Sequence, residues 1–159
     1  LLERAGNDAG DGSITALYTV LVEGDDLADP VADCARAALD GHIVLSRKLA
    51  GAGHFPAVDV LQSVSRVALD VMKPEQQRTA RDTRDALAAL AESSDLVDVG
   101  AYVAGSNPRV DHALAVKAPL QAFLRQEPDE ASAPHQTSDA LHKALMPPTP
   151  SPRREVARG

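Results

Sequence analysis

The amino-acid sequence predicts an α/β fold over residues 1–73 and a small all-helical domain over residues 74–146. Three observations indicate this. The first is an apolar, β-branched run at residues 14–22, and the second is a well-delimited helix and another apolar run that follow it. The third is a set of apolar side chains at helical spacing beyond Lys73-Pro74. A strand, a helix and a strand at this spacing predict a βαβ unit with parallel strands.

The run at residues 14–22, ITALYTVLV, is interpreted as the first strand. It shows no period-two alternation, as expected for a strand covered on both faces. Glycines at 10 and 12 predict a turn before it, and Gly24-Asp25-Asp26 predicts its end.

A helix is predicted to follow, with Asp29 as its N-cap, Pro30 at its first position and Gly41 just past its end. Residues 42–46 (HIVLS) form the second predicted strand. Residues 47–50 then predict a helical turn that Gly51 closes.

Three helices are predicted in the second half, at residues 75–92, 109–125 and 138–145. Pro119 lies inside the second helix and is expected to bend it or to remove one of its hydrogen bonds. The proline-rich residues 147–159 predict a disordered tail.

Composition excludes several classes of function. The formal net charge of −7 disfavours binding to nucleic acid or to an anionic membrane surface. Cys34 is the single cysteine, which excludes an internal disulfide and is typical of a reducing compartment such as the cytoplasm. No apolar run reaches the roughly 18 residues of a membrane span. The first residue is Leu1, so we expect the chain to be a fragment of a longer protein.

Four segments contain motifs that indicate a protein family as well as a fold class: LLERAG (1–6), SITALYTVLVEGDDLADPVAD (13–33), LDGHIVLSRKLAGAGHFPAVDVLQSVSR (39–66), and GAYVAGSNPRVDHALA (100–115) with AFLRQ (122–126). In this order and spacing the sequence resembles the C-terminal part of the flagellar and type III secretion ATPases, which are relatives of the catalytic subunits of rotary ATP synthases. The resemblance implies a fragment with the C-terminal part of a RecA-like ATPase core, followed by a helical C-terminal domain.

The resemblance also implies an assembly and a function. These enzymes form homo-hexameric rings at the cytoplasmic base of an export apparatus and couple ATP hydrolysis to protein export. Expected partners are a central stalk protein, a stator or regulator, and complexes of export chaperones with their substrates. Contact with the membrane is expected only through these partners.

Arg66 ends the motif Ser63-Val64-Ser65-Arg66, which matches the arginine finger of the family. A finger is a guanidinium that a neighbouring subunit supplies, in trans, to the γ-phosphate during phosphoryl transfer. An arginine suits this role because its planar fork is always charged. Without the resemblance, Arg66 would be interpreted as a surface residue at the end of a loop.

Phe55-Pro56 matches the family position that stacks on adenine, and Gln126 and Pro128 match the helical-domain side of that adenine pocket. The alternative interpretation places Phe55 in the core beside Leu49 and Val58.

Asp25, Asp26 and Asp29 resemble the family loop that faces the central stalk, as does the loop at residues 100–111. Carboxylates of this kind also suit a hard cation, and a solvated turn with an N-cap is the third interpretation. We predict no metal site, since the five histidines show no paired ligand spacing.

The chain contains no Gly-Lys pair and therefore no P-loop of the form G-x-x-x-x-G-K-[ST]. We expect the cofactor to be ATP with Mg²⁺, its phosphate and metal sites to lie outside this fragment, and the fragment by itself to be inactive. Two alternatives stay open: a rotary ATP synthase catalytic subunit, and a truncated, non-catalytic interaction protein. The motifs do not separate flagellar from virulence or symbiosis secretion.

Overall fold

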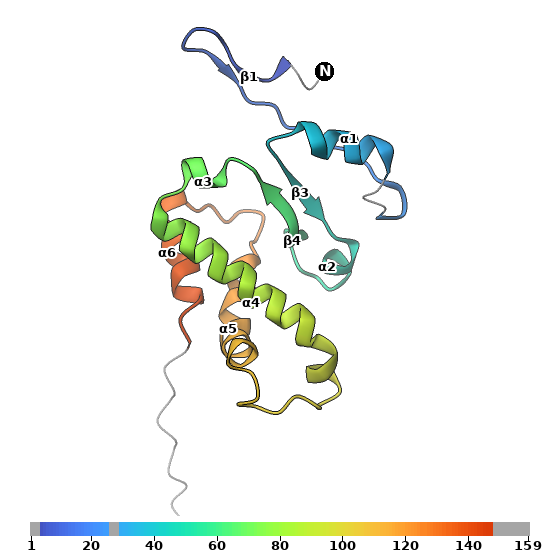
Figure 1. Cartoon of the computed structure of the whole chain (residues 1–159), viewed down its shortest axis with the longest axis vertical. Coiled ribbons are helices and arrows are strands. Elements are labelled where there is room, and N and C mark those ends of the chain that lie inside the picture. Colours follow the sequence, from blue (N-terminus) through green and yellow to red (C-terminus); the bar gives the residue numbers. More distant parts are fainter. Residues whose placement is uncertain (1–3, 26–28, 148–159) are drawn as a thin grey trace, which may run out of the picture.

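The computed structural model describes residues 4–25 and 29–147 and contains both predicted regions. Figure 1 shows a β hairpin at one end of the molecule, an α/β region in the middle, and the helices α4, α5 and α6 toward the other end. The elements in chain order are β1 (Gly6–Asn7), β2 (Ser13–Ile14), the 3-10 helix η2 (Glu23–Asp25), α1 (Pro30–Ala38), β3 (Gly41–Leu45), α2 (Arg47–Gly51), β4 (Val58–Ser65), α3 (Ala68–Val71), α4 (Pro74–Asp98), α5 (Pro108–Leu124) and α6 (Pro134–Ala144).

The strand predicted at residues 14–22 is not present as such. Only Ile14 belongs to a strand, and it pairs with Gly6 in the short β1–β2 hairpin. A strand needs a neighbour for its backbone N–H and C=O groups, and no described segment pairs with residues 15–22. The run therefore stays extended and open, with Leu17 96% and Leu21 92% exposed.

The strand pairing also differs from the prediction. The predicted second strand exists as β3, but it pairs antiparallel with β4, and no parallel pair occurs among the described strands. A parallel βαβ unit needs both strands in one sheet, and here the first of the two does not form. The predicted parallel pairing is thus wrong for the part of the chain that is described, while β3 itself is confirmed.

Helix α1 begins as predicted and ends earlier than predicted. The Asp29 carboxylate accepts hydrogen bonds from the N–H groups of Val31 (2.9 Å) and Ala32 (3.1 Å), as an N-cap does. The helix stops at Ala38, so Gly41 is not its terminal glycine. Gly41 instead opens β3, where a Cβ atom would lie 2.6 Å from the Val64 carbonyl oxygen. A glycine allows this close approach of two backbones.

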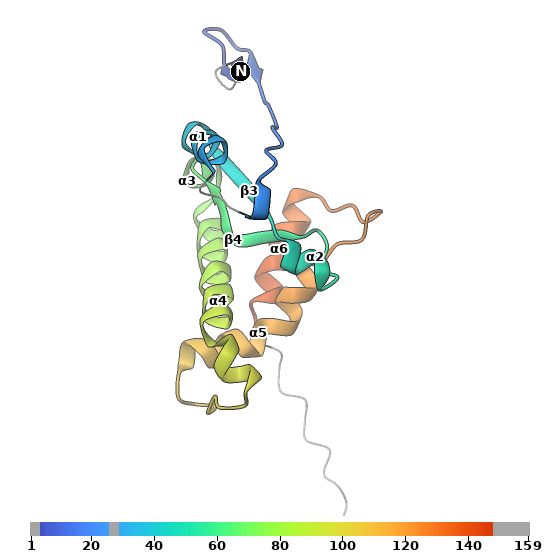
Figure 2. The same ribbon diagram turned by 90° about the vertical axis from the view of Figure 1, so that its right-hand side faces the viewer.

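Helices α4, α5 and α6, called the helical bundle below, pack together at the end of the molecule away from the hairpin (Figure 2). Each has a proline at its first turn. The core between α4 and α5 consists of small and branched side chains, against which Leu141 of α6 packs: Ala86, Ala89, Val110, Ala113, Val116 and Leu120. Helix α5 continues past Pro119 to Leu124, and α6 begins at Pro134, four residues before the predicted start.

An ion-paired arginine joins α4 to α5 on the surface of the bundle. The Arg109 guanidinium lies 2.7 Å from the Asp85 carboxylate and 2.7 Å from the Glu92 carboxylate. Hydrogen bonds to Glu92 and Asp85 raise the pKa of Arg109. The arginine is exposed, so we expect these two ion pairs to set the relative orientation of the helices and to add little to the free energy of unfolding.

The loop between α4 and α5 is organised around Asp111. Its carboxylate accepts hydrogen bonds from the Tyr102 hydroxyl (3.0 Å) and the Gly105 N–H (3.0 Å). Asn107 caps α5 through a hydrogen bond from the Arg109 N–H (3.0 Å). The loop predicted to meet the stalk is therefore held in one shape by its own side chains.

Two predictions concern residues outside the described ranges. These are the disordered tail, of which only Pro147 is described, and the stalk-facing residue Asp26. The boundary between two domains after residue 73 stays a prediction. In the described ranges 4–25 and 29–147, none of the helices has the length and apolar character that crossing a membrane requires.

Candidate functional site

Arg66 directly follows β4 and is held at the junction with α1. Its N–H donates a hydrogen bond to the Asp40 carbonyl (2.8 Å). Its guanidinium donates to the Arg36 carbonyl in the last turn of α1 (3.1 Å). The side chain is exposed, so the guanidinium is available to a partner outside the chain.

The strand leading to Arg66 contains a large bulge, called the β4 bulge below and made of residues 60–63. His42 pairs with Val64, but Val44 pairs with Asp59, so β4 carries extra residues between these pairs. Asp59 organises the bulge, since its carboxylate accepts the N–H groups of Leu61 (3.0 Å) and Gln62 (3.0 Å). The Ser63 hydroxyl donates to the Asp59 carbonyl (2.6 Å) and accepts the Val44 N–H (3.0 Å).

Arg84 of α4 reaches the β4 bulge from the helical bundle. Its guanidinium donates hydrogen bonds to the carbonyls of Val60 (2.7 Å), Leu61 (2.9 Å) and Ser63 (3.1 Å). Nothing in the sequence pattern pointed to Arg84, because an arginine on the polar side of a helix usually faces water. Its partners are backbone groups of a distant strand, which sequence spacing does not reveal.

A groove of about 540 Å³ lies between the β3–β4 connection and the segment after α5. We call it the Phe55 groove, and its lining contains all four predicted adenine-pocket residues: Phe55, Pro56, Gln126 and Pro128. The two walls are joined by a hydrogen bond from the Gln126 N–H to the Phe55 carbonyl (2.9 Å).

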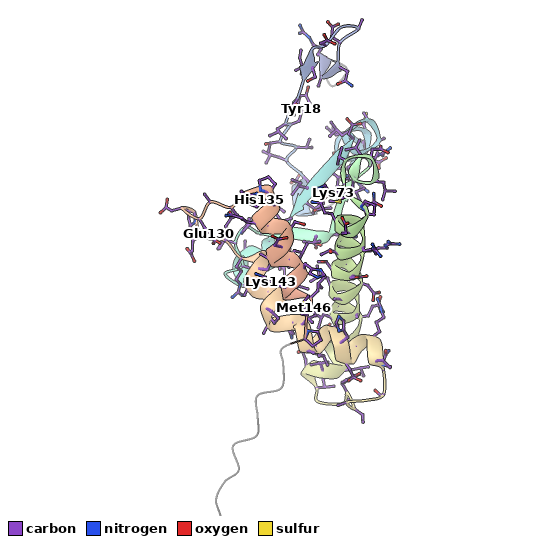
Figure 3. All side chains as sticks on the ribbon, turned by 90° about the vertical axis from the view of Figure 1, so that its left-hand side faces the viewer. Tyr18, Lys73, Glu130, His135, Lys143 and Met146 are labelled. Atoms are coloured by element: carbon purple, nitrogen blue, oxygen red, sulfur yellow. The ribbon has the colours of Figure 1, made fainter. Side chains whose placement is uncertain are left out.

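Phe55 presents its side chain to solvent rather than to the core, because 58% of it is exposed. The core interpretation therefore does not fit the structure, and the open ring suits stacking on a flat ligand. The opposite wall is a compact turn, in which the Gln126 amide donates to the Glu130 carbonyl (2.8 Å). Figure 3 shows that the segment carrying Glu130 projects away from α4.

Arg66 and the Phe55 groove lie at opposite ends of β4. Phe55 precedes the first residue of the strand, Val58, and Arg66 follows the last, Ser65. The structure thus brings the four groove residues together and keeps Arg66 apart from them.

The acidic segment is described only in part. Asp29 serves as the N-cap of α1, and the backbone of Asp25 ends η2. Within residues 4–25 and 29–147, no group of three or more histidine, cysteine, aspartate or glutamate side chains is placed to hold a metal ion.

Two family models match consecutive parts of the chain. Residues 1–65 match the ATP synthase alpha/beta family, nucleotide-binding domain. Residues 72–143 match the T3SS EscN ATPase C-terminal domain. The chain belongs to the flagellar and type III secretion ATPase family.

Both branches of this family are represented among the relatives. The flagellum-specific ATP synthase of Pseudomonas aeruginosa is 52% identical over 134 residues, which are 84% of this chain and 30% of the relative. The type 3 secretion system ATPase of Sinorhizobium fredii is 54% identical over 132 residues, 83% of this chain and 29% of the relative. The chain thus spans about 30% of the length of these curated relatives.

Solved structures show the same fold. The assembled ATPase EscN from the type III secretion system of enteropathogenic E. coli matches with a TM-score of 0.87 and 41% identity, over 91% of this chain and 35% of EscN. EscN in complex with its central stalk EscO matches with a TM-score of 0.81 and 38% identity, over 91% of this chain and 34% of that chain. The fold is therefore the C-terminal portion of a RecA-like ATPase core followed by a helical domain, as the resemblance implied.

Proposed function

We propose that this flagellar/type III secretion ATPase chain is part of a subunit that hydrolyses ATP with Mg²⁺ and couples the hydrolysis to protein export. Membership of the family supports this proposal, and relatives from both branches carry the name of an ATPase or ATP synthase. The chain lacks a P-loop, so the phosphates and Mg²⁺ are bound by residues of the complete subunit that lie outside it.

The observation that carries the proposal is the placement of Arg66 and the Phe55 groove at opposite ends of β4. One subunit thereby offers surfaces for two different nucleotides. The Phe55 groove holds the adenine of the subunit's own ATP, between the Phe55 ring and the wall that contains Gln126 and Pro128. Arg66 serves the ATP bound by the next subunit.

Arg66 then acts as an arginine finger in trans. Charge accumulates on the γ-phosphate oxygens as the phosphoryl group is transferred, and a guanidinium placed beside them lowers the barrier. The exposed Arg66 side chain, fixed by its backbone to Asp40, supports this role.

The assembly follows from the trans arrangement. A finger supplied in trans requires a second chain at the site, and we propose that this chain is another copy in a homo-hexamer. The solved complex of EscN with its central stalk supports a stalk partner, with Asp25, Asp26 and Asp29 and the 100–111 loop facing it. We place the ring in the cytoplasm at the base of the export apparatus, where a stator or regulator and chaperone–substrate complexes are its further partners.

The test is turnover of the complete ATPase with Arg66→Ala and Arg66→Lys. We expect kcat to fall by roughly 10³-fold or more for Arg66→Ala, because the guanidinium stabilises the γ-phosphate oxygens in the transition state. Arg66→Lys is expected to restore little of this kcat, since lysine lacks the planar fork. Binding of a fluorescent ATP analogue stays unchanged, and Arg81→Ala, an exposed arginine of α4, serves as the control. Loss of nucleotide binding in a folded Arg66→Ala ring would remove Arg66 from the finger role.

A further inference from the structure

Arg84 connects the helical bundle to β4, the strand that Arg66 follows. Its guanidinium donates to the carbonyls of Val60 (2.7 Å), Leu61 (2.9 Å) and Ser63 (3.1 Å). We propose that Arg84 is a positioning residue, which fixes the β4 bulge in the shape that presents Arg66 to the neighbouring nucleotide. This inference rests on the proposed finger role of Arg66.

The carbonyls of the β4 bulge need hydrogen-bond donors from outside the β3–β4 ladder. From His42 to Val44 the partner of β3 moves from Val64 to Asp59, so residues 60–63 have no regular ladder partner on β3. The Gln62 carbonyl lies 3.1 Å from His42 Nε2 of β3, whereas the carbonyls of Val60, Leu61 and Ser63 have no ladder donor. The residues are partly exposed, and a charged donor makes a stronger hydrogen bond than a neutral one, so a guanidinium holds their carbonyls more firmly than a neutral donor does.

An arginine meets this need better than other side chains. Its planar fork carries five N–H donors in fixed directions, so one guanidinium can bind several carbonyls at once. Here Nη1 serves Val60 and Ser63 while Nη2 serves Leu61. A lysine ammonium carries its donors on a single atom, so we expect it to bind fewer of these carbonyls.

The helix that carries Arg84 is itself firmly placed. Its neighbours Thr83 and Ala86 are buried, and Ala86 belongs to the core shared with α5. Three residues after the Ser63 carbonyl the chain reaches Arg66, whose backbone is then fixed by Asp40. The position of Arg66 therefore depends on both contacts, one from the helical bundle and one from the end of α1.

The first experiment measures ATP turnover of the complete ATPase with Arg84→Ala and Arg84→Lys. Small misplacements of a catalytic group can cost about 100-fold, so we expect kcat for Arg84→Ala to fall by up to about 100-fold. KM changes little, because the finger acts in the transition state. Arg84→Lys retains part of the activity, and the control Arg81→Ala retains all of it. A rise in KM with kcat unchanged would overturn the inference.

A double-mutant cycle tests whether Arg84 acts through Arg66. In an Arg66→Ala ring, the added Arg84→Ala change is expected to cause no further loss of turnover, since the group it positions is absent. Losses that multiply would mean that Arg84 acts independently, and the inference would fail while the finger role stood. Full turnover in Arg66→Ala alone would instead refute the proposed function.

Hydrogen exchange gives a readout that does not depend on activity. In Arg84→Ala we expect faster amide exchange at residues 60–66, with the protection of α5 retained as evidence of an intact bundle. If Arg84→Ala does not fold, Arg84→Lys takes its place in the same comparison. Unchanged exchange at residues 60–66 in a folded variant would overturn the inference.

Discussion

At the scale of single residues, Phe55 is the side chain whose surroundings argue most directly for a ligand. It is 58% exposed at the edge of a groove, although large aromatic side chains gain most free energy when buried. Its carbonyl is bound by the Gln126 N–H, so the backbone of Phe55 is held beside the opposite wall. An exposed ring on a backbone fixed in this way suits stacking on adenine.

Replacing Phe55 tests this role. Phe55→Ala is expected to weaken ATP binding to the complete ATPase by about 1–3 kcal/mol, the range for loss of one base-stacking partner. Phe55→Tyr should keep most of the affinity, because the aromatic face remains. Titration with a fluorescent ATP analogue measures both, and Leu69→Ala, another exposed apolar residue, is the control. Equal affinities for Phe55→Ala and the unchanged protein would contradict the stacking role.

A substitution at Gly41 tests how closely the backbones of β3 and β4 approach each other. Adding a methyl group there brings Cβ to 2.6 Å from the Val64 carbonyl oxygen, so the backbones must separate. We expect Gly41→Ala to lower the free energy of unfolding by roughly 1–3 kcal/mol. Gly51→Ala is the matched control, since nothing lies within 4 Å of its added Cβ. Urea unfolding compares the two, and equal stability would show that the close approach is relaxed in solution.

At the scale of elements, α1 joins two regions of proposed function. Asp29 caps its first turn, and the Arg36 carbonyl in its last turn accepts from Arg66. The carboxylate of Asp29 thus has a structural role that is separate from any contact with a stalk. A substitution that keeps the cap but removes the charge distinguishes the two roles.

Asp29→Ala is expected to lower the free energy of unfolding by about 1 kcal/mol, because the first-turn N–H groups lose their acceptor. Asp29→Asn keeps an acceptor oxygen and should retain nearly full stability. Urea unfolding measures this difference, while co-purification with the central stalk protein measures the effect of the lost charge. Equal destabilisation by Ala and Asn would contradict the cap seen in the structure.

The sequence predicted those elements whose signals are local. The cap at Asp29, the strand β3 and the helices α4 and α5 follow from residue types within a few positions of each other. The run at residues 14–22 was misassigned because a strand depends on a pairing partner, which its own residues do not specify.

The candidate site was predicted through motifs and not through geometry. The resemblance indicated the four groove residues, and the structure brings them together in one groove. The β4 bulge and Arg84 were not predicted, because backbone carbonyls bound by a distant side chain leave no pattern in the sequence. Pro134 as the start of α6 was also missed, although a proline at a first turn is a recognisable signal.

At the scale of the whole molecule, the helical bundle and the α/β region differ in how well they cover their apolar residues. The bundle buries a continuous core from Ala86 to Leu120. In the α/β region, Leu17, Leu21, Ile43 and Leu45 remain largely exposed. Large apolar side chains left exposed in this way favour association with other chains.

We therefore expect the isolated 159-residue chain to associate or to be poorly soluble. The paired change Leu17→Ser and Leu21→Ser should reduce the association, because it removes the two most exposed of these side chains. Leu96→Ser with Val99→Ser, at the far end of α4, is the control. Light scattering provides the measurement, and a monodisperse monomer of the unchanged chain would contradict the expectation.

The central claim is that Arg66 completes the nucleotide site of a neighbouring subunit. The most direct measurement mixes two inactive forms of the complete ATPase: one carries Arg66→Ala, and the other has a disabled P-loop and an intact Arg66. We predict that mixed rings regain ATP turnover, because Arg66 of one form meets the intact phosphate site of the other. Mixed rings that assemble but stay as inactive as either form alone would contradict the claim.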